Sequence, residues 1–153
     1  MTSTAREHVR VPVGPERAMS VWTDVRRWPA FVEGFGRLVE QDPAWPEVGA
    51  GIVWESIPRG RGRVSERVVE AAHGRLLATE VLEERLTGTQ TVRFEPADGA
   101  DVADVGIELD YRLVRGGPLG RVTDVLFIRR AMTEALQRTL ERFAMEVEEE
   151  DGP

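Results

Sequence analysis

The sequence predicts an α+β fold in which a curved antiparallel sheet of about seven strands wraps around a long C-terminal helix. Three patterns lead to this prediction. Apolar and polar residues alternate strictly through residues 105–113, which is typical of a half-buried strand. Most of the other strand-like segments are joined by short turns, which indicate antiparallel neighbours. Residues 119–148 carry apolar side chains at helical spacing, and this segment is long enough to cover the apolar face of a sheet.

The chain is expected to begin with a strand that is followed by two short helices. Residues 7–13 alternate, with their valines on one face. Pro15 and Glu16 suit the first turn of a helix, because proline lacks an N–H that this turn would leave unpaired and glutamate complements the helix dipole. Asp24 is a candidate cap for a second short helix that ends near residue 32.

The middle of the chain is predicted to be a series of strands. Their ranges are 37–41, 52–57, 63–72, 75–86 and 90–95. Turns are expected at 58–62, 73–74 and 87–88, and a longer loop at 96–104. The final strand, 105–113, should turn its Val, Ile, Leu and Tyr side chains inward and Glu108, Asp110 and Arg112 outward.

The terminal helix is expected to begin near Leu119, after the break at 116–118, and to end near Glu148. Its predicted apolar stripe consists of Val122, Val125, Leu126, Met132, Leu136, Leu140, Phe143 and Val147. The acidic end, about residues 148–153, is predicted to be frayed and solvated. Internal repeats and linker-like segments are absent from the sequence, so residues 1–153 are interpreted as one domain.

The composition excludes several classes of protein. A net charge of −7 disfavours binding of nucleic acid through a basic surface, and the chain has no cysteine for disulfide or thiolate chemistry. No apolar run approaches the roughly 20 residues of a membrane-spanning helix, and the N-terminus lacks the apolar core of a signal peptide. These features favour a cytoplasmic protein without a membrane span.

The residues do not assign a catalytic group. His8 and His73 have no partner at a useful spacing, metal-ligand clusters are absent, and no serine has the surroundings of a nucleophile. Six glutamates of the middle strands are candidates, namely Glu55, Glu66, Glu70, Glu80, Glu83 and Glu84. A carboxyl group inside an apolar cavity can act as a general acid or base, but the mixed pattern of 63–86 does not predict which of these points inward.

Three segments resemble one known family. They are VRVPVGPERAMSVW at 9–22, DVRRWPAF at 24–31, and DYRL at 110–113 followed by GGPLG at 116–120 and the terminal helix. Together they resemble the START-type, birch-pollen-allergen-like helix-grip superfamily, and within it the polyketide cyclase/dehydrase and lipid-transport family. The resemblance covers nearly the whole chain and implies a helix-grip fold with a cavity between the sheet and the last helix.

This resemblance implies that the cavity binds a hydrophobic or aromatic small molecule, such as a lipid, a quinone or a polyketide-like compound, without a cofactor. Aromatic rings and flexible apolar side chains suit the wall of such a cavity. The residues expected to line it are Trp28, Trp54, Gln90, Phe94, Leu109, Tyr111, Met132 and Leu136.

Two alternatives use the same cavity. The first is a polyketide cyclase, aromatase or dehydratase, in which the cavity would hold a reactive chain in the shape from which ring closure is easiest, so that one acid/base residue could suffice. The second is a module that binds a protein partner or an acyl carrier protein, and the chain would act as a monomer or a homodimer in each case. Because antiparallel connections alternate between the ends of a sheet, Arg59, Arg61, Arg63 and Arg115 are predicted to form a basic rim at the cavity mouth, where guanidinium groups would attract an anionic group.

Overall fold

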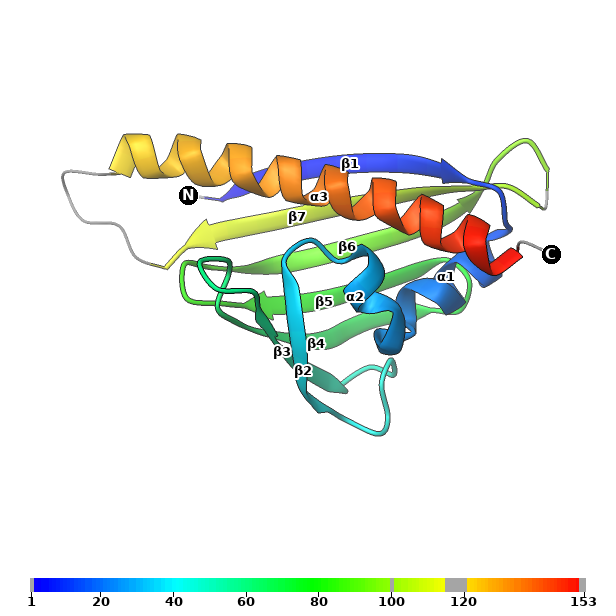
Figure 1. The fold of residues 1–153 in the computed structure, drawn as a ribbon, viewed down its shortest axis with the longest axis horizontal. Coiled ribbons are helices and arrows are strands. Elements are labelled where there is room, and N and C mark those ends of the chain that lie inside the picture. Colours follow the sequence, from blue (N-terminus) through cyan, green and yellow to red (C-terminus); the bar gives the residue numbers. More distant parts are fainter. Residues whose placement is uncertain (1, 100, 115–120, 152–153) are drawn as a thin grey trace.

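A curved sheet forms the body of the molecule, and its helices lie on the inner face (Figure 1). The computed structural model describes residues 2–99, 101–114 and 121–151, and the side chains of 121–125 and 150–151 are outside this description. The helical elements are α1 (Pro15–Thr23), the 3₁₀ turn η1 (Val25–Arg27), the short α2 (Trp28–Phe31) and α3 (Arg121–Asp151). The strands are β1 (Ser3–Val11), β2 (Phe35–Gln41), β3 (Gly51–Ser56), β4 (Arg63–Ala72), β5 (Leu76–Leu82), β6 (Leu86–Pro96) and β7 (Ala103–Leu113).

The strands are hydrogen-bonded in the order β1-β7-β6-β5-β4-β3-β2, and each pair is antiparallel. β2 to β7 therefore form a meander, and β1 completes the sheet beside β7. Irregular register in β2 and β4 marks bulges, which increase the local bend of a sheet. This architecture confirms the predicted helix-grip α+β fold. The two short helical segments after β1 are α1 and the consecutive pair η1 and α2. Asp24 caps the second of these segments, because its carboxylate accepts a hydrogen bond from the Arg26 backbone N–H at 3.2 Å.

One predicted turn is wrong. The segment predicted as a single strand at 75–86 is interrupted after Leu82, and the hairpin turn occupies 83–85 instead of 87–88. Thr87 and Gly88 are instead paired with Arg112 and Tyr111 inside the β6–β7 ladder. A Cβ atom at Gly88 would lie 2.2 Å from the Asp110 carbonyl oxygen, so glycine is required here for close approach of the two strands and not for a turn.

The alternation of β7 is confirmed. Val105, Ile107, Leu109 and Tyr111 are buried on the inner face. Asp110 and Arg112 are exposed, and Glu108 is half-exposed beside Arg6 of β1. β1 begins at Ser3, earlier than the predicted start at residue 7, because its N-terminal residues pair with β7 as far as Tyr111.

One face of α3 is buried from Leu136 onward, whereas none of residues 126–135 is fully buried. Leu136, Leu140, Phe143 and Val147 are buried, as predicted. Leu126 was predicted to lie on the apolar stripe but is 62% exposed, and Phe127 is 67% exposed. In Figure 1 the N-terminal end of α3 extends beyond the ends of β1 and β7. The helix also continues to Asp151, past the predicted end near residue 148, and the predicted helix start lies outside the described residues.

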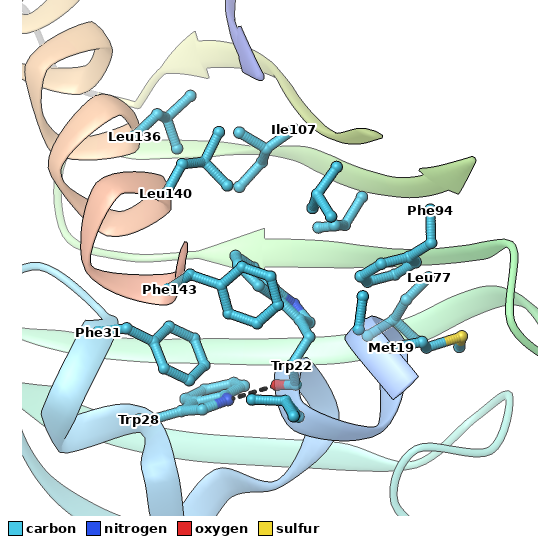
Figure 2. Close-up of a cluster of buried hydrophobic side chains, with 14 of the residues drawn as sticks. Met19, Trp22, Trp28, Phe31, Leu77, Phe94, Ile107, Leu136, Leu140 and Phe143 are labelled. Carbon is cyan, nitrogen blue, oxygen red and sulfur yellow. Dashed lines mark hydrogen bonds between the residues drawn. The ribbon is translucent and has the colours of Figure 1, made fainter. Parts of the chain in front are cut away.

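An aromatic cluster joins α1, α2 and the C-terminal half of α3. Trp22, Phe31 and Phe143 have ring centroids 5.1 to 5.4 Å apart in each pair, and all three side chains are buried (Figure 2). The indole N–H of Trp28 donates a hydrogen bond to the Trp22 carbonyl oxygen at 2.8 Å, which fixes α2 against α1. This cluster anchors the helices on the sheet and leaves the neighbouring space under the middle of α3 for a cavity.

Candidate ligand-binding site

A largely enclosed cavity of about 40 Å³ lies between the inner face of the sheet, α2 and α3. This volume holds no more than a few water molecules. The walls are formed by Trp22, Trp28, Val32, Glu33, Trp54, Arg61, Glu66, Gln90, Ile107, Leu109, Met132, Ala135, Leu136 and Thr139. Ligand sites for small organic molecules typically have volumes of about 300 to 1,000 Å³, so a ligand of that size requires the cavity to widen.

Most of the residues that the sequence predicted for the site lie together around this cavity. They are Trp28, Trp54, Gln90, Leu109, Met132 and Leu136. Trp54 is 1% exposed, which places its ring on the inner face of the sheet. Leu136 projects from α3 toward Ile107 of β7 (Figure 2).

Phe94 and Tyr111 are buried on the same face but do not line the cavity. Phe94 is four residues beyond Gln90, about 13 Å farther along β6. α1 packs on β6, and Figure 2 shows the Phe94 ring near Met19 of α1. Tyr111 is two residues beyond Leu109 in the opposite direction. Its hydroxyl group makes no hydrogen bond within the described residues. Burial raises the pKa of Tyr111, and the charge of the Arg129 guanidinium offsets part of this increase.

A buried carboxylate forms part of the cavity floor. Glu66 of β4 is 7% exposed, and each of its oxygens accepts a hydrogen bond. The indole N–H of Trp54 donates to Oε2 at 3.0 Å, and the Thr79 hydroxyl donates to Oε1 at 3.1 Å. Val64, Glu66 and Val68 alternate with polar residues in β4, and this short period of two would have been a usable signal for an inward-facing Glu66.

A second buried carboxylate holds an arginine at one side of the cavity. Arg61, from the β3–β4 hairpin, donates a hydrogen bond to Glu83, which follows β5 and whose side chain is 3% exposed. The guanidinium of Arg61 lies 5.4 Å from the centroid of the Trp54 ring, at a distance suited to a cation–π interaction. Arg61 therefore closes the cavity above Trp54 while its charge is balanced by Glu83.

The segment after α2 is attached to α3 on the other side of the cavity. The Glu33 backbone N–H donates a hydrogen bond to the Thr139 hydroxyl at 3.0 Å. The Glu33 carboxylate accepts hydrogen bonds from Arg138, at 3.4 Å, and from Arg142. These contacts fix the position of α2 relative to the middle of α3, so that this wall of the cavity is tied down by polar bonds as well as by apolar packing.

The predicted rim residues occupy different positions around the hairpin end of the sheet. Arg61 lines the cavity, Arg59 is exposed, and Arg63 donates a hydrogen bond to Glu55 on the outer face at 2.8 Å. This bond, together with the charge of Arg37, lowers the pKa of Glu55. Arg115 lies outside the described residues.

The β3–β4 hairpin, the β5–β6 hairpin and the residue that follows β7 lie at one end of the sheet, whereas residues 116–118 are outside the described part of the chain. Arg61 of the β3–β4 hairpin bonds Glu83 of the β5–β6 hairpin. The Val114 N–H, just after β7, donates a hydrogen bond to the Arg85 carbonyl oxygen at 2.9 Å.

Within the part of the chain that the structure describes, His, Asp and Glu side chains form no group of three that could hold a metal ion. No described helix is both long enough and apolar enough to cross a bilayer. The cavity instead combines aromatic and aliphatic walls with a few convergent polar groups, which is the usual composition of a site for a small organic molecule.

The family model for polyketide cyclase / dehydrase and lipid transport proteins matches residues 2–148. The chain belongs to this family. No curated protein matches its sequence. Among solved structures, the Zhui aromatase/cyclase from Streptomyces sp. R1128 superposes with a TM-score of 0.77 at 13% identity, over 97% of this chain and 94% of that one.

Two further solved structures have the same fold as this polyketide cyclase / dehydrase and lipid transport family member. A START superfamily protein from Mycobacterium smegmatis gives a TM-score of 0.73 at 14% identity, covering 95% of this chain and 97% of the other. Norcoclaurine synthase from Thalictrum flavum, in complex with dopamine and hydroxybenzaldehyde, gives 0.70 at 14% identity, covering 100% and 90%. At these identities the similarity establishes the shared fold.

Proposed function

We propose that the protein binds a hydrophobic or aromatic small molecule in the cavity between the inner face of the sheet and α3. The observation that supports this most strongly is the convergence of Trp28, Trp54, Leu109, Met132 and Leu136 on one enclosed space. Transfer of apolar ligand surface into such a space is favourable by roughly 25 cal/mol per Å². The family to which the chain belongs includes lipid transport proteins, which agrees with this proposal.

The small volume of the cavity requires that binding widens it, and two features make this possible. Met132 is only partly buried and has a flexible, unbranched side chain that can adopt other rotamers. Leu126 and Phe127 of α3 are exposed and none of residues 126–135 is fully buried, so this stretch has fewer buried apolar side chains against the sheet than the part of the helix that follows. A ligand that displaces Met132 would enlarge the cavity toward this stretch of the helix.

Met132→Trp tests the location of the site. The indole ring would fill the cavity and should abolish binding of an aromatic probe such as naphthol, measured by calorimetry. Overpacking typically costs about 1 to 3 kcal/mol, and the partial exposure of Met132 should keep the cost at the lower end. Met145→Trp is the matched control, because Met145 is on the same helix but 61% exposed, and it should bind the probe normally. Normal binding by Met132→Trp would place the site elsewhere.

The ligand itself can be found by native mass spectrometry of the protein purified from its own host. A co-purifying mass that is absent from Met132→Trp but present in Met145→Trp would identify a molecule that depends on the cavity. Loss of the mass from both variants, or retention by both, would contradict the proposed site.

The buried position of Glu66 favours one alternative, an enzyme of the cyclase, aromatase or dehydratase type. A carboxylate at the cavity floor could accept or return a proton while the walls hold a polyketide-like chain in position. In that case Glu66→Gln should lose turnover of a polyketide-like substrate even at a saturating substrate concentration. Equal turnover by the variant and the wild-type protein would remove Glu66 from any catalytic role.

A further inference from the structure

The charge of Glu66 is not balanced by a described residue. The ion pairs of the described residues include the other buried glutamate, Glu83, but none involves Glu66. Its two hydrogen bonds come from neutral donors, the Trp54 indole and the Thr79 hydroxyl. An ionised carboxylate has about four lone-pair sites, so about two acceptor sites remain. A buried charge without a cationic partner is costly and marks a candidate binding position.

Glu66 is one end of a polar row that crosses the cavity floor. Thr79 of β5 donates to Glu66 of β4 and lies directly opposite Gln90 of β6 in the sheet register. Gln90 lines the same cavity, and its side-chain amide forms no hydrogen bond within the described part of the chain. The row thus presents one carboxylate and one unpaired amide to the space where a ligand would lie.

Apolar groups flank this row on both sides. Trp54 of β3 lies beyond Glu66, and Leu109 of β7 lies opposite Gln90. Met132 and Leu136 of α3 complete the apolar wall. The nearest cation that lines the cavity, Arg61, is already paired with Glu83. An anionic group at the floor would therefore meet a like charge without compensation, whereas a hydrogen-bond donor would find free acceptor sites.

We propose that Glu66 and Gln90 select a ligand that carries a hydrogen-bond donor, such as a phenolic hydroxyl or an amine, on an apolar or aromatic body. This inference rests on the proposed ligand-binding function and specifies its ligand class. The donor bonds the Glu66 carboxylate, the Gln90 amide orients the same polar group, and the body of the ligand packs against Trp54, Met132 and Leu136. Hydrogen bonds to charged groups are stronger than those between neutral groups, so Glu66 contributes more to the selection than Gln90.

Three probes of nearly equal ring size test this selection in the wild-type protein: naphthol, methoxynaphthalene and naphthoate, each substituted at the same ring position. Naphthol offers a donor, methoxynaphthalene lacks one, and naphthoate is anionic at neutral pH. Calorimetry should give an affinity for naphthol at least about ten-fold higher than for methoxynaphthalene, and naphthoate should bind most weakly. Aminonaphthalene should resemble naphthol, which would show that the donor and not the hydroxyl oxygen is recognised.

Glu66→Gln removes the charge but keeps the shape. Naphthol should bind less tightly to this variant, while naphthoate should bind more tightly than to the wild-type protein, and these opposite changes cannot come from general damage to the fold. Gln90→Leu leaves Glu66 in place and should reduce the preference for naphthol by a smaller factor.

The outcomes separate the two proposals. If all probes bind with equal affinity and Met132→Trp blocks each of them, the donor selection is wrong and the ligand-binding function stands. If none of the probes binds, or Met132→Trp has no effect on their binding, the proposed function fails and the selection fails with it. An unchanged naphthol preference in Glu66→Gln would also overturn the assignment to Glu66.

Discussion

The two ends of the layer between the helices and the sheet are built differently. At one end, the rings of Trp22, Phe31 and Phe143 pack against one another. There α3 contributes the buried side chains of Leu140, Phe143 and Val147. At the other, the cavity contains Glu66 and Arg61, and α3 passes over it with Met132 partly buried and Leu126 and Phe127 exposed. The first end has the properties of a packed core, and the second has a small cavity, buried charged groups and a stretch of α3, residues 126–135, without a fully buried residue.

This difference indicates a division of roles. Aromatic packing at one end supplies stability that does not depend on a ligand, while the cavity end retains polar groups and space that an optimally packed core would have removed. Local opening of the N-terminal half of α3 would then enlarge the cavity without disturbing the Trp22–Phe31–Phe143 cluster. Mutations at the two ends should accordingly have separable effects on stability and on binding.

The largest effect is expected from truncation within the aromatic cluster. Phe143→Ala should lower the free energy of unfolding by about 3 to 5 kcal/mol, because Phe143 is 0% exposed and contacts both Trp22 and Phe31. Phe127→Ala, on the same helix but 67% exposed, should change it by less than about 0.5 kcal/mol. Denaturant unfolding measures both variants. Similar losses would mean that the N-terminal half of α3 is as firmly packed as the C-terminal half.

Sequence patterns predicted the architecture well where the residues obey a single period. The alternation in Val105–Leu113 reflects burial on one face only, and Leu136, Leu140 and Phe143 recur at helical spacing because one stripe of α3 packs on the sheet. The pattern fails at Gly88, where glycine serves the close approach of two strands, and at Leu126, which continues the apolar stripe of α3 but is 62% exposed.

The candidate site was predictable only in part. Aromatic and aliphatic residues such as Trp54 and Met132 were placed by face and by helix position. Phe94 shares the face of Gln90, but its distance along the strand puts it under α1, and periodicity carries no information on which helix covers which part of a strand. Glu66 escaped prediction because the strand pattern around it is mixed beyond Val68, where β4 changes register by a bulge.

Trp54 provides a sharper test of the difference between the cavity end and the aromatic-cluster end of the molecule, since it lines the cavity and is not part of the cluster. In a variant that retains Trp54 as its only tryptophan, an aromatic ligand in the cavity should quench the indole emission, because the ring lines the cavity and bonds Glu66. A matched variant that retains only Trp45, whose indole N–H bonds the Thr23 carbonyl oxygen outside the cavity, should respond less. A stronger response from Trp45 would contradict the proposed location of the ligand.

The smallest effect concerns the rim of arginines, which we propose attracts an anionic group that remains outside the cavity, such as the acidic surface of an acyl carrier protein. Arg61 is already paired with Glu83 and Arg63 with Glu55. The attraction therefore depends on Arg59 and on the positive potential that these two ion pairs leave uncancelled at the surface. Arg59→Glu with Arg63→Glu should slow association with an acylated carrier protein by roughly ten-fold at low salt. At 1 M salt, where the screening length is about 3 Å, the rates should converge.

The control, Arg75→Glu with Arg93→Glu, makes the same change in net charge with exposed residues at the opposite end of the sheet, and should leave the rate nearly unchanged. Stopped-flow fluorescence measures the rates, and equal slowing by both double variants would assign the effect to net charge and remove the rim from the proposed function.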